Sequence, residues 1–81
     1  MGIDAGDDVF VNDGEEIVGH VRRASLRELV VFIEDHGDFV LPRSSVTATG
    51  NNFVVLGCQS LPLRMRAVIG HLHGESYDPD A

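Results

Sequence analysis

Two similar stretches decide the fold class: DGEEIVGHV at residues 13–21 and GDFVLPRSSV at residues 37–46. Each begins with a turn signal containing Asp and Gly and continues into a short segment rich in β-forming residues. Turns that repeatedly lead into short strands are typical of a small, strongly bent antiparallel barrel. Neither stretch supplies a reactive group, so the pattern predicts an architecture and no chemistry.

We expect a mainly β fold, an SH3-like antiparallel β-barrel of five or six strands over residues 8–57. The expected β segments are residues 8–11, 16–23, 28–34, 39–41 and 53–56, with a helical turn at 43–46 and an extended piece at 47–49. Gly19 shares an apolar face with Ile17 and Val21, and a glycine there predicts a barrel corner. The helical turn is expected to place Val46 in the core. The run LVVFI at residues 29–33 is apolar on both faces and needs cover on both.

From Ser60 onward the apolar period changes from about 2 to about 3.6 residues, which predicts an amphipathic helix over residues 60–74. Its apolar stripe consists of Leu61, Met65, Val68, Ile69 and Leu72. Ser60 is a suitable N-cap, Pro62 fits the first turn, and Gly74 suits the left-handed position beyond the last turn. Gly70 then lies inside the helix, where it costs about 1 kcal/mol relative to alanine. Residues 75–81 are expected to fray.

The formal charge of −7 is concentrated at the N-terminal end. Residues 1–16 hold six acids and no base, whereas the rest of the chain holds seven acids and six arginines. We expect residues 1–7 to form a flexible acidic N-terminus. Phosphate-backbone binding needs clustered cations, so this balance argues against nucleic acid as a partner.

Length and cysteine usage bound the remaining possibilities. The 81 residues make one domain with a thin core, and the single Cys58 excludes an intramolecular disulfide. Residues 1–8 lack the features of a secretory signal, and no apolar run reaches the roughly 18 residues of a membrane span. We therefore expect a cytoplasmic protein with no membrane span. The basic residues are all arginine, which indicates a GC-rich genome.

Several segments together resemble the PRC-barrel family and related small, uncharacterised bacterial proteins. The resemblance rests on Asp13-Gly14-Glu15 with Ile17–Val21, on Phe39–Pro42 with Val46, and on Val54–Leu56, and it covers about residues 7–57. It implies a PRC-type barrel that docks to proteins and helps to assemble complexes. The family has no common catalytic residues to carry over, and the helix beyond Ser60 lies outside its pattern.

A reactive cysteine and a histidine metal site are the candidate chemistries of this sequence, and each has a structural alternative. Cys58 precedes the expected helix and could be a reactive thiol, but a buried, inert cysteine at the strand-to-helix junction is the favoured hypothesis. His71 and His73 would point about 200° apart on a helix, so they could share a metal only in extended chain. Ser44, Ser45 and Ser60 with the four histidines, His20 and His36 included, form no nucleophile elbow. We expect no enzyme, metal or cofactor.

The interaction hypothesis names two surfaces. Arg22, Arg23 and Arg27 form the only basic cluster and could dock an acidic partner, or could simply be solvated edge charges. Helix residues Leu61, Met65, Ile69 and Leu72 could cover Val30 and Phe32 of their own chain or of a second copy. The sequence therefore predicts a non-enzymatic protein-interaction module with an unknown protein partner and a possible homodimer. The alternatives are an SH3-like ribosome- or RNA-associated factor and a small ligand or metal sensor.

Overall fold

Six short strands and one short helix make up the computed structural model, which describes residues 2–12, 14 and 16–72. The strands are β1 (Asp8–Val11), β2 (Gly19–Ala24), β3 (Glu28–Ile33), β4 (Gly37–Pro42), β5 (Val46–Gly50) and β6 (Phe53–Leu56). Two 3₁₀ turns, η1 (Arg43–Ser45) and η2 (Cys58–Ser60), precede β5 and the helix α1 (Leu63–Ile69), respectively. The mainly β fold and the helical turn after Pro42 are confirmed.

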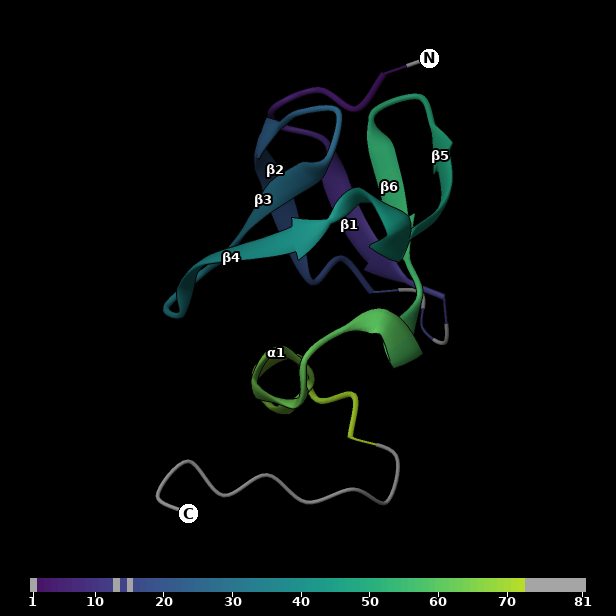
Figure 1. Cartoon of the computed structure of the whole chain (residues 1–81). Coiled ribbons are helices and arrows are strands. Elements are labelled where there is room, and N and C mark those ends of the chain that lie inside the picture. Colours follow the sequence, from purple (N-terminus) through teal and green to yellow (C-terminus); the bar gives the residue numbers. More distant parts are fainter. Residues whose placement is uncertain (1, 13, 15, 73–81) are drawn as a thin grey trace.

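The strands form one mixed sheet in the order β4-β3-β2-β1-β6-β5 (Figure 1). β1 lies parallel to β6, with Val9 beside Val54, whereas the other neighbouring pairs are antiparallel. The purely antiparallel prediction is therefore wrong for this pair. The reason is that η1 joins β4 to β5 without a hairpin reversal, so β6 runs in the direction of β1. β4 and β5 have one neighbour each, so the hydrogen-bonded sheet of the described residues is not closed.

Gly19 lies where two backbones approach each other. A Cβ atom at this position would collide with the carbonyl oxygen of Phe32, so the glycine is needed for the pairing of β2 with β3. The register of β2 on β3 shifts between Val21 and Arg23, which is a β-bulge. The sequence predicts a barrel corner at Gly19; the structure has a close approach of two backbones there, and the bulge lies further along the strand. Ile17, predicted on the apolar face of this strand, lies before β2 and is exposed.

The core is one hydrophobic cluster between the inner face of the sheet and the segment that contains α1. Its buried members are Ile3, Val9, Val11, Val21, Leu29, Val31, Ile33, Phe39, Leu41, Val54, Leu56, Cys58, Leu61 and Met65. In β1, β3 and β6 these residues alternate with more exposed ones, as the period of a strand requires. Burying each large apolar side chain contributes about 1.5–3 kcal/mol.

The turn η1 fully buries a residue that the sequence analysis did not place in the core. Ser45 is fully buried, whereas Val46 is only partly buried. The Ser45 hydroxyl has no hydrogen-bond partner among the described residues, although its carbonyl accepts from the Gly57 amide at 2.8 Å. Val46 packs against the core as predicted but is only partly buried, and the 3₁₀ turn points the Ser45 side chain inward as well.

The acidic segment before β1, expected to be a flexible terminus, contributes to the core. Ile3 and Asp7 are buried. The Gly6 amide donates to the Val21 carbonyl at 2.7 Å, and the Asp4 amide donates to Asp7 Oδ2 at 3.0 Å. The Val21 amide also donates to the Asp7 carbonyl at 2.8 Å, so two backbone bonds hold this segment against β2 and it is ordered despite its acidic composition.

The helix is shorter than the predicted 60–74. Ser60 lies in η2 and provides no side-chain cap for α1, which begins after Pro62. Gly70 adopts φ 77° and ends the helix, with the His71 amide donating to the Arg66 carbonyl at 2.8 Å. This left-handed end is available to glycine at little cost, so Gly70 takes the role predicted for Gly74. Gly74 and the tail 75–81 lie outside the described residues.

Candidate interaction surfaces

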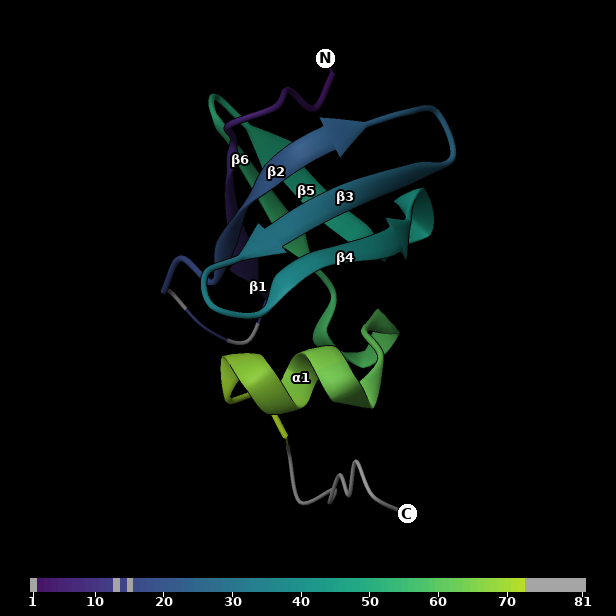
Figure 2. The same cartoon turned by 90° about the vertical axis from the view of Figure 1, so that its left-hand side faces the viewer.

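The helix packs against its own chain. α1 lies at the end of the sheet away from the N-terminus, beyond β4 (Figure 1 and Figure 2). Leu61 and Met65 belong to the core, and Ile69 packs partly against it. The Arg64 guanidinium lies 4.4 Å from the centre of the Phe39 ring on β4. The apolar stripe is therefore used within the chain.

Val30 and Phe32 do not meet the helix stripe, although the sequence suggests that pairing. They alternate along β3 with the buried Leu29, Val31 and Ile33, so their side chains point to the opposite, outer face. Val40 of β4 is 61% exposed beside Val30 on this face. A hollow of about 430 Å³ lies between these valines and Arg22, Arg23 and Asp38.

Arg22 is bound by its own neighbours. Its Nε lies 2.8 Å from Asp38 Oδ1, and its guanidinium lies 4.5 Å from the centre of the Phe32 ring. Both side chains of the ion pair are about half exposed, so the pair contributes at most about 1 kcal/mol to stability. The three arginines of the predicted basic cluster therefore have different surroundings. Arg22 contacts side chains of β3 and β4, whereas Arg23 lies near the end of β2 and Arg27 lies in the connection between β2 and β3.

That connection, residues 25–27, displays a leucine and is here named the Leu26 turn. The Leu26 side chain is 93% exposed. The Ser25 amide donates to the Glu28 carbonyl at 2.8 Å, and the Ser25 hydroxyl bonds to the Glu28 backbone as well. From η1, Arg43 donates its amide to the Arg27 carbonyl at 2.8 Å and its Nη1 to the Ser25 carbonyl at 2.6 Å. The backbone of the turn is therefore held from both sides while its apolar tip faces solvent.

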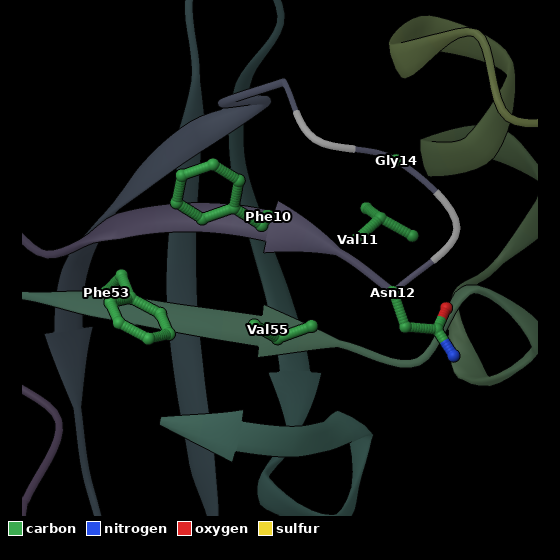
Figure 3. Close-up of a pocket in the computed structure, with 6 residues that line it drawn as sticks. All are labelled: Phe10, Val11, Asn12, Gly14, Phe53 and Val55. Atoms are coloured by element: carbon green, nitrogen blue, oxygen red, sulfur yellow. The ribbon is translucent and has the colours of Figure 1, made fainter. Parts of the chain in front are cut away.

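The second apolar feature is a hollow of about 360 Å³ on the outer face of β1 and β6, here named the aromatic hollow (Figure 3). It is lined by Phe10, Val11, Asn12, Gly14, Phe53 and Val55. The Phe10 and Phe53 rings meet edge to face with their centres 6.2 Å apart. The Phe53 ring lies over Gly50, where a Cβ atom would collide with it. Gly50 thus leaves the space that this ring occupies.

Sequence reasoning did not assign a role to Leu26, Phe10 or Phe53. The parallel pairing of β1 with β6 brings Phe10 beside Val55 and Asp8 beside Phe53, and no local pattern predicts that pairing. One feature of the sequence could have indicated such a surface, namely an apolar residue within a polar connection between two predicted strands. Leu26, within the polar connection Ser25–Arg27, carries that signal.

The junction at the end of β6 accounts for Cys58. The thiol is buried, its Sγ lies 3.7 Å from the His71 carbonyl oxygen, and the Cys58 amide donates to Asn12 Oδ1 at 3.0 Å. These contacts fit a packing role at the strand-to-helix junction. His20 lies on β2 against Phe32, His36 in the β3–β4 turn and His71 after α1, while His73 lies outside the described residues.

Among residues 2–12, 14 and 16–72, no group of three or more His, Cys, Asp or Glu side chains could hold a metal ion. No helix in this described part of the chain is long and apolar enough to cross a membrane. Comparison with known proteins gives no match to a family model, a curated protein or a solved structure.

Proposed function

We propose that the chain is a non-enzymatic protein-interaction and assembly module of the PRC-barrel type, acting in the cytoplasm. The coiled six-stranded sheet around one core, with α1 across one end, supports barrel character. The shared features with the family are the Asp-Gly turn before β2, the tight glycine at Gly19 and the proline that ends β4.

One observation carries the proposal: the chain covers the apolar stripe of its helix and leaves the Leu26 turn and the aromatic hollow open. The apolar residues of the core are almost fully buried, whereas Leu26 and Phe53 lie outside the core and are 93% and 37% exposed. Transferring one such side chain from water into a partner is worth about 1.5–3 kcal/mol. A rigid turn also loses little conformational entropy on binding. Both features suit protein contacts.

The test is a quantitative affinity purification from cells that express the chain. Proteins that bind the wild type are expected to be lost with Leu26→Asp or Phe53→Asp and retained with Thr49→Asp, which adds the same charge to the exposed β5 strand. A partner identified in this way must bind again as a purified protein. Equal recovery of all proteins by the wild type and both surface variants would contradict the proposal.

A further inference from the structure

We propose that the Leu26 turn of one copy docks into the aromatic hollow of a second copy of this chain. The inference rests on the proposed interaction function and names one partner and one mode of contact for it. The contact joins two different surfaces and is therefore a head-to-tail contact. The relative orientation of the two surfaces decides whether the copies form a closed ring or an open chain.

The Leu26 turn has the properties of an inserting element. Its tip is a single leucine with nearly its whole side chain in solvent, and the backbone beneath it is held by bonds from Ser25 and Arg43. Because the turn is ordered before binding, insertion buries apolar surface without first ordering a loop.

The aromatic hollow has the matching properties of a receptor. It is a wide, shallow depression of about 360 Å³, more than the volume of one leucine side chain, and its apolar lining consists of Phe10, Phe53, Val11 and Val55. The rings are set by the packing of Phe53 on Phe10 and by the absence of a side chain at Gly50. Among the described residues Phe53 is 37% exposed, so part of its ring is available to a partner.

Charge gives the reason to choose a second copy as the occupant. Arg23, Arg27 and Arg43 surround the Leu26 turn, and none of them forms an ion pair within the described part of the chain. The other surface carries acid among the described residues: Asp8 is exposed and is paired with Phe53 across β1 and β6. A basic rim around the inserting leucine and an acidic side chain beside the hollow are complementary.

The experiment is sedimentation velocity of the full chain across a series of concentrations, with two variants and their mixture. The wild type is expected to show sedimentation coefficients that rise with concentration. Leu26→Asp removes the inserting side chain and Phe53→Asp removes one aromatic wall of the hollow, so each alone is expected to weaken association at least about tenfold. Mixed in equal amounts they are expected to form a heterodimer, because one copy retains the hollow and the other retains the turn.

The controls separate docking from general effects of charge and folding. Val40→Asp adds the same charge at an exposed valine on the face of β3 and β4, and it is expected to associate like the wild type. Phe10→Ala is a second variant of the hollow if Phe53→Asp lowers the melting temperature. Higher salt is expected to weaken the contact, since the rim charges attract across it.

Three results would overturn the inference: a wild type that is monomeric throughout, variants that associate as strongly as the wild type, or a mixture of variants that forms no heterodimer. The proposed function fails separately. A monomeric chain that still captures another protein through the Leu26 turn or the aromatic hollow contradicts docking between copies and leaves the interaction module in place.

Discussion

The inner side of the helix segment differs from the Leu26 turn and the aromatic hollow in how far its apolar side chains are covered. Met65 of α1 and Leu61, which precedes the helix, are buried in the core. At the Leu26 turn and over β1 and β6, leucine and phenylalanine side chains remain in contact with solvent. Apolar residues that the core does not need are therefore not equivalent, because tertiary packing covers some of them and leaves others in solvent.

The largest expected effect lies at the helix. Met65→Ala removes a fully buried side chain from the core and is expected to lower the free energy of unfolding by about 2–5 kcal/mol. Leu63→Ala is the matched control in the same helix, because Leu63 is 37% exposed and should cost less than about 1 kcal/mol. Denaturant unfolding followed by circular dichroism measures both. Equal effects would show that the helix does not dock within its own chain.

The end of the helix provides a test in which the sign of the change in stability distinguishes two structures. Gly70→Ala is expected to destabilise the fold by about 1–2 kcal/mol, because alanine must adopt the left-handed conformation that glycine has at φ 77°. If the helix instead ran through Gly70, the same substitution would stabilise it by about 1 kcal/mol. The direction of the shift in the denaturation midpoint therefore distinguishes the observed helix from the predicted one.

A smaller effect of opposite sign is expected in η1. Ser45→Ala removes a buried hydroxyl that has no hydrogen-bond partner in the described part of the chain, and it should raise the free energy of unfolding by up to about 1 kcal/mol. Ser44→Ala, at the exposed neighbouring residue, should change little. A loss of stability in Ser45→Ala would mean that this hydroxyl has a partner, such as a bound water.

The smallest effect on stability is expected at the surface of the turn. Leu26→Ala should change the free energy of unfolding by less than about 0.5 kcal/mol, because the side chain is exposed and contributes little packing. Thermal unfolding of dilute protein measures this without interference from association. A cost comparable to that of Met65→Ala would show that Leu26 belongs to the core and is not available to a partner.

Local chemistry predicted much of the fold. Short apolar segments bounded by Gly, Asp and Asn turns correctly placed the strands at 8–11 and 53–56 and the reversals near Gly37 and Asn52. The helix was predicted at the right place but too long, because the apolar period continues to Leu72 after the left-handed Gly70 has ended the backbone helix. Periodicity reports where apolar side chains recur, and it does not report where the hydrogen bonding stops.

The candidate surfaces were less predictable. The basic cluster was found, yet the sequence did not show that Asp38 and Phe32 engage Arg22 while Arg23 and Arg27 flank an exposed leucine. The aromatic hollow was not found at all, because Phe10 and Phe53 are 43 residues apart in the chain and meet only through the parallel pairing of β1 with β6. The pairing of distant strands depends on the direction in which each strand runs. Here η1 joins β4 to β5 without reversing the chain, and the sequence shows no hairpin turn that would predict this.

The amino-acid sequence by itself determined the short β segments, the turns between them, one C-terminal amphipathic helix and the acidic bias of the N-terminal end. These properties depend on the conformational preferences and polarity of neighbouring residues. Only the tertiary structure decided that β6 lies beside β1, that the helix covers its own core, and that Leu26 and Phe53 remain exposed. Those outcomes depend on which distant surfaces exclude water from each other, and neighbouring residues alone do not specify that.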